Sequence, residues 1–322
     1  MPRRIIIDTD PGVDDALALL LALRSPELHI EAITVVSGNV HLDLCLENAF
    51  RILNAAGVAE RPPVARGCER PLERSPVEAS HVHGDDGLGQ ITKILEPNGP
   101  LRYPTPAIEP VGRHAVDVIL DLVGKHPDQI SIVALGPLTN IATAIRKDAI
   151  TMGQVQELIV MGGSLNGQGN VTPVAEFNFY ADPEAARVVV QSGIGVTVVG
   201  LDVTHRAVLP RKAFDERTGS ESDDYTRFLR DVTAKWFDFA EGRSLDGAYL
   251  HDPLAVGVAI DPTFVETEVF AADVETGGEL TQGMLVTDRR RVPGVEEGTP
   301  MRGCVEVDSE RFVRFFLSRV VG

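Results

Sequence analysis

The sequence is poor in cysteine and contains no long hydrophobic run. Its three cysteines, Cys45, Cys68 and Cys304, lie far apart and form no CxxC pair, so the sequence predicts neither a disulfide framework nor a thiolate zinc site. No apolar run approaches the roughly 18 residues that a membrane span requires, which argues against a membrane partner. The first four residues lead directly into an apolar segment and leave no room for a signal peptide. We therefore expect a cytoplasmic protein.

Positive charge is also scarce. Lysine and arginine number 30 against 47 aspartates and glutamates, which gives a net charge of −17 and argues against nucleic acid or an acidic membrane surface as a partner. Hydrophobic residues make up 43% of the chain and charged residues 24%, as in globular proteins with a sizeable core. The sequence shows no linker, repeat or low-complexity tract, so we expect one domain spanning residues 1–322.

Strand-like and helix-like segments alternate along most of the chain, which predicts an α/β fold with a single doubly wound, mostly parallel, Rossmann-like sheet. The expected strands cover residues 5–7, 29–37, 63–65, 130–135, 158–161 and 196–201, with helices over 16–23, 42–56, 111–124, 251–260 and 309–320 and through much of 210–243. Residues 265–274, 283–289 and 304–307 predict a small antiparallel β-rich addition near the C-terminus. Two long loops are expected at 67–110 and 164–181, and such loops are often functional.

Four aspartates are crowded between the first expected strand and the first expected helix. Asp8, Asp10, Asp14 and Asp15 flank a Pro-Gly turn, where like charges repel and an unpaired buried carboxylate is costly. A bound cation is the simplest compensation, and the carboxyl end of a strand is where ligands bind in such sheets. The alternative is that Asp8 ends the strand and Asp14 caps the helix, which accounts for only part of the cluster.

Other expected strand ends also carry polar residues or tight turns, namely Gly38-Asn39, Leu135-Gly136, Met161-Gly162-Gly163 and Asp202. Carboxylate and carbonyl oxygens together form a site that suits Ca²⁺ or Mg²⁺ rather than zinc. His251-Asp252 is the most suggestive distant pair. Its alternative interpretation is an ordinary N-cap, with Pro253 at the first helical position.

Residues 174–180 (VAEFNFY) place Glu176 and Asn178 two positions apart. If this segment is extended, both side chains point to one face and could hold a polyhydroxy ligand. A surface strand is the alternative, and Asn170 and Asn178 could equally form turns. His83 lies in an expected glycine-rich loop, where the alternative to a ligand contact is a side chain exposed to solvent.

The chain resembles the inosine-uridine-preferring nucleoside hydrolases over essentially its whole length. The resemblance is carried by several motifs in order: Asp8-Thr9-Asp10-Pro11-Gly12-Val13-Asp14-Asp15, Gly38-Asn39, His81-Val82-His83-Gly84, Gly136-Pro137-Leu138-Thr139-Asn140, Met161-Gly162-Gly163, Val174-Ala175-Glu176-Phe177-Asn178, Gly200-Leu201-Asp202-Val203-Thr204-His205 and His251-Asp252-Pro253. One such match alone would be weak, whereas this many in the same order is a specific signal.

The resemblance implies an N-glycosyl hydrolase that cleaves ribonucleosides with water and a tightly bound Ca²⁺. By position, Asp10, Asp15 and Asp252 match the side-chain metal ligands, and Leu135 matches the residue that offers its backbone carbonyl. Asp10 also matches the general base. His251 matches the general acid that protonates the departing base.

The same resemblance assigns the substrate contacts and the assembly. Asp14 and Asn39 match the residues that hold the ribose 2′- and 3′-hydroxyls, and Met161 lines the ribose pocket. Asn170, Glu176 and Asn178 match those around the 5′-hydroxyl, and His83 lies where some members contact the base. A small-molecule ribonucleoside substrate, a role in nucleoside salvage and a homodimer or homotetramer are implied.

Two other functions are compatible with parts of the sequence. A strand followed by Asp-x-Asp also begins the Mg²⁺-dependent aspartyl phosphatases, but here Pro11-Gly12 follows Asp10 and Asp14-Asp15 come too soon. The other is a nucleoside- or ribose-binding protein without turnover, although the aspartates that catalysis needs are all present. Base preference depends on residues 67–89 and 225–249 and stays open between purines and pyrimidines.

Overall fold

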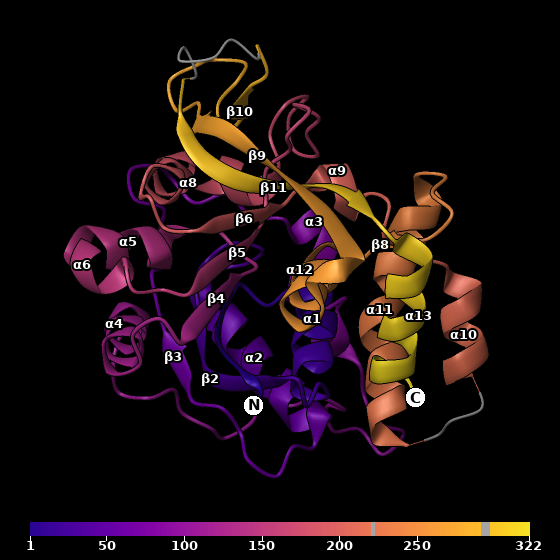
Figure 1. The fold of residues 1–322 in the computed structure, drawn as a ribbon. Helices are drawn as coiled ribbons and strands as arrows, with labels where there is room; N and C mark the ends of the chain where they lie inside the picture. The colour runs from indigo at the N-terminus through magenta and orange to yellow at the C-terminus, as the bar shows by residue number, and fades with distance from the viewer. Residues whose placement is uncertain (220–222, 291–296) are drawn as a thin grey trace.

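A nine-stranded sheet forms the centre of the computed structural model, which describes residues 1–219, 223–290 and 297–322. The strand order is β10-β9-β11-β6-β5-β4-β1-β2-β3, and the pairs from β6 to β3 are all parallel (Figure 1). These strands are β1 (Arg3–Thr9), β2 (Leu28–Val35), β3 (Val64–Arg66), β4 (Ile130–Ala134), β5 (Glu157–Met161) and β6 (Val196–Val199). The doubly wound, mostly parallel sheet expected from the sequence is confirmed.

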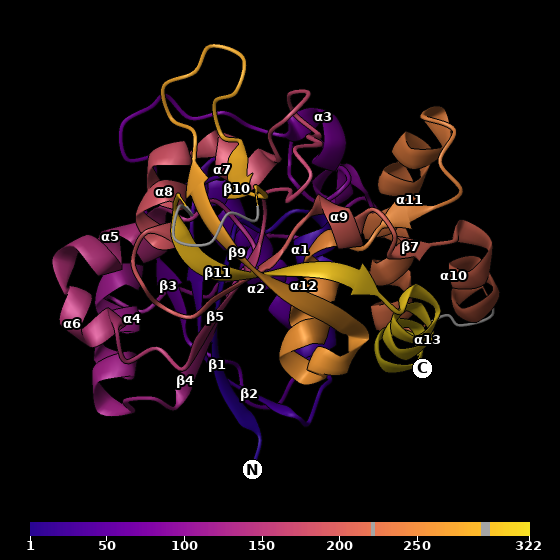
Figure 2. The same cartoon turned by 45° about the horizontal axis from the view of Figure 1, so that its top comes forward.

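The antiparallel addition near the C-terminus is also confirmed, and it continues the main sheet. β11 (Thr299–Val307) pairs parallel with β6, whereas β9 (Val265–Val274) and β10 (Leu285–Asp288) add antiparallel strands at the edge. Figure 2 shows β9 and β11 as two long ribbons that lie side by side. A separate two-stranded ribbon joins β7 (Val208–Leu209) to β8 (Ala248–Tyr249).

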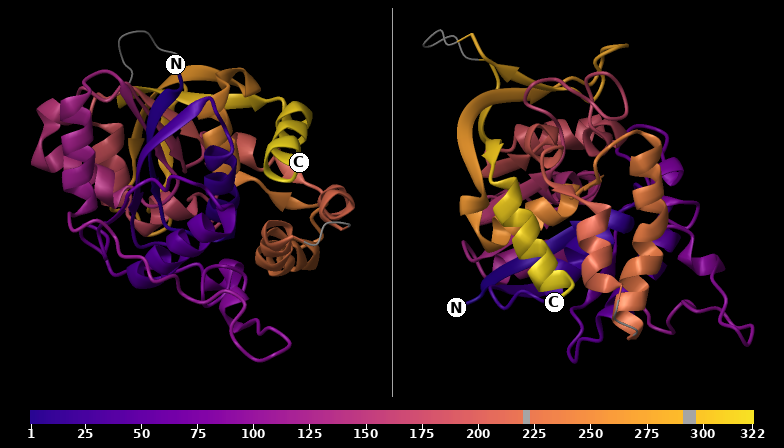
Figure 3. Two further views of the ribbon diagram at one scale, coloured as in Figure 1. Left: turned by 90° about the horizontal axis from the view of Figure 1, so that it is seen from below. Right: turned by 90° about the vertical axis from the view of Figure 1, so that its right-hand side faces the viewer.

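Helices cover both faces of the sheet. The central strand β1 is accordingly apolar on both of its sides. Ile5 and Ile7 pack into one core and Ile6 into the other. The first core contains side chains of α1 (Val13–Leu23), α2 (Leu42–Ala56), α10 (Arg211–Thr218), α11 (Asp224–Gly242), α12 (His251–Ile260) and α13 (Ser309–Val320), and Figure 3 shows α11 and the yellow α13 on one side. The second contains α4 (Ala115–Lys125), α5 (Thr139–Lys147), α6 (Ala149–Met152) and α8 (Pro183–Val190). None of the described helices is long and apolar enough to span a membrane.

Several short helices lie in the connections between the longer elements. They are α3 (Ser80–His83), α7 (Phe177–Ala181), α9 (Leu201–Thr204), and the 3₁₀ turns η1 (Ile91–Lys93) and η2 (Pro262–Phe264). The extended conformation considered for residues 174–180 is absent from 177 onward, because Glu176 caps α7 by accepting the backbone N–H groups of Asn178 and Phe179. Side-chain acceptors of this kind favour a helix start over a strand.

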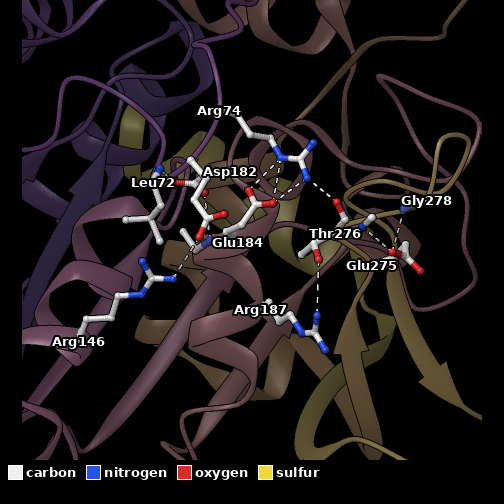
Figure 4. A network of polar contacts seen from close by, with 12 residues as sticks. Leu72, Arg74, Arg146, Asp182, Glu184, Arg187, Glu275, Thr276 and Gly278 are labelled. Atoms are coloured by element: carbon white, nitrogen blue, oxygen red, sulfur yellow. Dashed lines mark hydrogen bonds and ion pairs between the residues drawn. The ribbon is translucent and has the colours of Figure 1, made fainter.

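The loop that begins at Gly67 is fastened to the start of α8. Asp182 accepts the N–H of Leu72 at 2.9 Å, the hydroxyl of Thr139 at 2.7 Å and, as the N-cap of α8, the N–H of Ala185 at 3.0 Å. Arg74 binds Glu184 through two nitrogens and also the carbonyl of Thr276 (Figure 4). Asp182 therefore caps α8, which begins at Pro183, and it also anchors a loop.

Replacing Asp182 by alanine is expected to lower the free energy of unfolding by about 2 kcal/mol or more, because three donors lose their acceptor in a buried place. Asp148→Ala is the matched control, since Asp148 caps only α6 through Thr151, and about 1 kcal/mol is expected. Urea unfolding of both variants measures the difference. Equal losses would show that the anchoring bonds of Asp182 contribute nothing beyond the cap.

Candidate functional site

A cavity of about 170 Å³ opens at the carboxyl ends of the central parallel strands. Its walls come from the segments that follow β1, β2, β4 and β5, together with α3, α7, α11 and the start of α12. Most of the residues expected at the site line it: Asp14, Asn39, His83, Leu135, Met161, Asn170, Glu176, Asn178, His251 and Asp252. Asp10 and Asp15 lie behind this wall, at 1% and 0% exposure.

Carboxylates gather at the floor of the cavity. Asp14, Asp15 and Asp252 each offer an oxygen atom, and these atoms lie within 4.8 Å of one another. Asp252 reaches this group from the start of α12, where Leu250 is the N-cap and receives no side-chain bond. The alternative that Asp252 is an ordinary N-cap was therefore wrong, because its carboxylate faces the other acids.

Asp10 lies between two glycines, which explains the Gly38 and Gly136 turns. A Cβ atom at either position would collide with the Asp10 carboxylate. Its Oδ2 accepts the backbone N–H of Asn39 at 2.7 Å, whereas Oδ1 is buried with no hydrogen-bond partner in the described part of the chain. A buried carboxylate oxygen without a donor is a natural place for a cation or a polar ligand.

Hydrogen bonds in the first turn of α1 determine where the last two aspartates of the motif, Asp14 and Asp15, point. Asp15 accepts the N–H of Gly12 at 2.9 Å and the hydroxyl of Thr9, so Asp15 completes the helix start and the alternative that Asp14 caps it was wrong. Asp14 remains free to face the cavity. Gly12 allows this close packing, because a Cβ there would lie 2.7 Å from Asn39 Nδ2 and 2.8 Å from His83 Nδ1.

Burial and mutual repulsion hold these acids far from their ordinary titration range. Burial raises the pKa of Asp14 to about 6. Burial, followed by neighbouring carboxylates, raises the pKa of Asp10, of Asp15 and of Asp252. Among the described residues, the cavity wall carries one arginine, Arg243, and no lysine. A divalent cation held by oxygen ligands would supply the missing positive charge, so the donor set fits a hard cation.

The neighbouring wall is polar and its side chains are held in place. Glu176 accepts the N–H groups of Gly163 and Asn178, both at 3.0 Å, and burial raises its pKa to about 7. Asn178 donates from Nδ2 to the carbonyl of Leu135 at 2.6 Å and of Met161 at 3.2 Å. Glu176 and Asn178 therefore both face the cavity, and they do so from the start of a helix rather than from an extended segment.

Both histidines expected at the site are neutral because they are buried. Burial lowers the pKa of His83 to about 4, and its Nδ1 accepts the N–H of Val13 at 3.1 Å, so the solvated alternative was wrong for His83. Burial first, then His205 and His83, lower the pKa of His251 to about 3. Nδ1 of His251 lies 2.8 Å from the hydroxyl of Thr204.

The remaining wall is aromatic. The sequence indicated only the range 225–249 for most of it, without single residues. Trp236, Phe239, Ala240 and Arg243 line the cavity from α11, together with Tyr249 and His205, and Arg243 stacks over the ring of Phe239 at 4.2 Å. Positions 236, 239, 240 and 243 recur with helical periodicity, which is the signal that could have identified this face. Tyr225 points elsewhere, to the carbonyl of Val320. Asp202 is also outside the cavity, since it accepts the N–H groups of Leu165 and Asn166.

Comparison with known proteins gives consistent matches over the whole chain. The family model for inosine-uridine preferring nucleoside hydrolases matches residues 5–314. The inosine-uridine preferring nucleoside hydrolase of Leishmania major is 41% identical over 90% of this chain and 89% of its own length. The pyrimidine-specific ribonucleoside hydrolase RihA of Photobacterium profundum is 37% identical over 98% of this chain and 100% of its own.

Solved structures agree with these matches. The plant nucleoside hydrolase PpNRh1 superposes with a TM-score of 0.89 at 34% identity and covers 100% of both chains. The purine-preferring ribonucleoside hydrolase of Gardnerella vaginalis also gives a TM-score of 0.89 at 34% identity, over 99% of this chain and 98% of its own.

The acids of the cavity predict an unusual pH dependence for the metal-free protein. Glu176 and Asp8 have pKa values raised to about 7 by burial, so between pH 6.5 and 8 the folded state binds more protons than the unfolded state. The free energy of unfolding must then fall as pH rises through this window, by about 1.5 kcal/mol from these two acids together. His83 and His251 oppose about half of this fall, because in the unfolded state they are about half charged at pH 6.5 and lose that charge by pH 8, whereas in the folded state they are neutral throughout.

Thermal unfolding in excess EDTA at pH 6.5, 7.2 and 8.0 measures this effect, with a falling Tm expected. Asp252→Asn removes one raised pKa and is expected to flatten the slope. A wild-type Tm that rises steadily over the same range would contradict the protonation of the buried acids.

Proposed function

The chain belongs to the inosine-uridine preferring nucleoside hydrolase family, and from that premise we propose that it hydrolyses ribonucleosides to free base and ribose with a bound Ca²⁺. The members of this family are N-glycosyl hydrolases, which rules out the aspartyl phosphatase alternative. The observation that carries the proposal is the buried Asp10 oxygen without a partner, set beside the cluster of Asp14, Asp15 and Asp252. Residues 1–322 act as one domain in this proposal, within a homodimer or homotetramer.

The residues proposed to hold the ion are Asp10, Asp15, Asp252 and the carbonyl of Leu135. Leu135 already accepts a hydrogen bond from Asn178, and its oxygen keeps a second lone pair for an ion. Oxygen-only donors in a site of high negative charge suit Ca²⁺. When bound, the ion would lower the pKa of water at this place and balance the charge of the carboxylates.

Asp10 is proposed as the general base. Its Oδ2 is fixed by the N–H of Asn39, so Oδ1 is held in one direction without a competing donor. This oxygen can take the proton from the attacking water as the water adds to the anomeric carbon. The carboxylates around it also stabilise the positive charge that develops on the ribose ring.

The polar wall is proposed to bind the sugar. Asp14 and Asn39 would hold the 2′- and 3′-hydroxyls and Met161 the ribose ring, while Glu176, Asn178 and Asn170 would surround the 5′-hydroxyl. A 5′-phosphate would meet the carboxylate of Glu176, and the single arginine among the described lining residues belongs to the aromatic wall. Like charges in a buried place repel strongly, so the site favours nucleosides over nucleotides.

The base is proposed to lie against the aromatic wall, with His251 and His83 near it. His251 protonates or hydrogen-bonds the departing base from Nε2, because Nδ1 is occupied by Thr204. Trp236, Phe239 and Tyr249 offer faces for stacking to either a purine or a pyrimidine. Inosine and uridine are the first substrates to test, and values of kcat/KM for inosine, adenosine, guanosine, uridine and cytidine define the preference.

Asp10→Asn is expected to lower kcat on the best nucleoside by about 100-fold or more, since the proton of the attacking water loses its acceptor. Asp8→Asn is the matched control: it lies near the end of β1, two residues before Asp10, and is equally buried. Its Oδ2 also has no partner among the described residues, but its Oδ1 is bound by Thr34 and Asn140, and a loss below about tenfold is expected. A reducing-sugar assay for released ribose measures both. An Asp10→Asn variant with near-normal kcat would remove Asp10 from this role.

Removal of the metal is expected to abolish ribose release, and added Ca²⁺ is expected to restore it. Calorimetric titration of the metal-free protein is expected to detect Ca²⁺ binding, which Asp252→Asn should weaken by about tenfold or more, because one charged ligand is lost. Asp202→Asn should keep normal binding, since Asp202 lies outside the cavity. Undiminished hydrolysis in excess chelator, with no bound metal, would refute the dependence on Ca²⁺.

A further inference from the structure

Thr204 contacts the proposed leaving-group histidine from behind the cavity wall. It is the last residue of α9 and is fully buried, and its hydroxyl lies 2.8 Å from Nδ1 of His251. Thr204 is not among the residues that line the cavity, whereas His251 is. The side-chain hydrogen bond of Thr204 therefore reaches the cavity through His251.

The backbone around this pair is fixed independently of the hydroxyl. The N–H of Thr204 donates to Gly200 at 3.1 Å, and the N–H of Ala207 donates to the carbonyl of Thr204 at 3.1 Å. Leu250 in turn donates to Ala207 at 2.8 Å, next to the antiparallel ribbon of β7 and β8. Removing the hydroxyl would thus leave both segments in place, so its loss tests one hydrogen bond.

Two aromatic rings also lie beside the imidazole of His251. The ring of His205 stands edge-on at 5.6 Å, and the ring of Tyr249 lies at the same centroid distance on a tilted plane. Within the described residues, no hydrogen bond engages Nε2 of His251. The polar edge that carries Nε2 is therefore free for a ligand in the cavity.

A hydroxyl has a property here that a carboxylate or a carbonyl lacks. Within the described residues the Thr204 hydroxyl has no partner other than Nδ1, so its hydrogen has Nδ1 as its acceptor when the imidazole is neutral. When the imidazole is charged, the hydroxyl accepts from Nδ1–H. In both states the hydrogen that faces the cavity is on Nε2. A carboxylate at this place would hold the hydrogen on Nδ1 and leave Nε2 bare in the neutral ring.

We propose that Thr204 is a positioning residue that keeps a hydrogen on Nε2 of His251, directed at the leaving base. The proposal rests on the proposed nucleoside hydrolysis and deepens it. In the step it serves, Nε2–H of the neutral imidazole donates a hydrogen bond to the base while the C1′–N bond breaks and its electron pair goes to the base. The hydrogen stays on Nε2, and the base takes up from solvent the proton equivalent that the attacking water releases to Asp10. Thr204 itself touches no substrate.

Two substrates with different leaving groups distinguish the positioning role of Thr204 from a general loss of structure. Thr204→Val is expected to lower kcat on inosine about tenfold, with KM little changed, because the base leaves poorly without a hydrogen-bond donor at Nε2. On 4-nitrophenyl β-D-ribofuranoside at pH 8, where the leaving group needs no proton, the same variant should keep its rate within about twofold. Thr204→Ser, which retains the hydroxyl, should behave as the wild type on both substrates.

A matched control is Thr233→Val. Thr233 is also buried, and its hydroxyl donates to the carbonyl of Leu229 at 2.7 Å in α11; the variant should affect both substrates alike. In a His251→Ala background, Thr204→Val should cause no further loss on inosine, since its partner is gone. A comparable loss on both substrates, or an additive loss with His251→Ala, would overturn the proposal.

A second readout does not depend on turnover. In protein labelled with ¹⁵N-histidine, the His251 signals, assigned by their absence in His251→Gln, should show Nδ1 bare and Nε2 protonated at pH 8. Thr204→Val should give a mixture of tautomers. A wild-type ring protonated at Nδ1 would overturn the proposal, whereas the expected tautomer in a protein that cleaves neither riboside would refute the proposed function and leave the positioning role standing.

Discussion

The burial of several carboxylates in one place is the constraint on which the site depends. Asp10, Asp14, Asp15 and Asp252 lie at the carboxyl edge of the sheet, and burial together with mutual repulsion opposes their ionised forms. The chain manages this by close backbone approach: glycines at 12, 38 and 136 leave room for N–H donors and for neighbouring side chains. One oxygen of Asp10 is left without a donor, which is where the arrangement stays incomplete until a ligand arrives.

The two walls of the cavity can orient a ligand in different ways. The polar wall orients oxygen and nitrogen atoms by hydrogen bonds to the backbone, as when Glu176 accepts two N–H groups and Asn178 donates to Leu135. The aromatic wall orients by shape, through rings from α11 and β8. His83 and His251 lie at the junction, and each is oriented through Nδ1 by a different partner. This division matches a ligand with a hydroxylated half and a planar half.

Much of the fold could be predicted because its determinants are local. The run Ile5, Ile6 and Ile7 indicates a strand buried on both faces, and α2 ends before Gly57, which has a φ of +62°. The failures came where a side chain competes with the expected element. Glu176 begins a helix where an extended segment had been considered, and Asp15 rather than Asp14 bonds to the start of α1, which excludes the alternative given for Asp14.

The sequence by itself determined the alternation of strands and helices, the acidic turn and, through its motifs, the family. Only the tertiary structure decided that Asp252 joins Asp14 and Asp15, that Asp10 keeps one oxygen free, and that Thr204 contacts His251. The reason is physical. Helical and strand periodicity act over a few residues, whereas these contacts join segments far apart in the chain, and the packing of the whole sheet and its helices sets their distances.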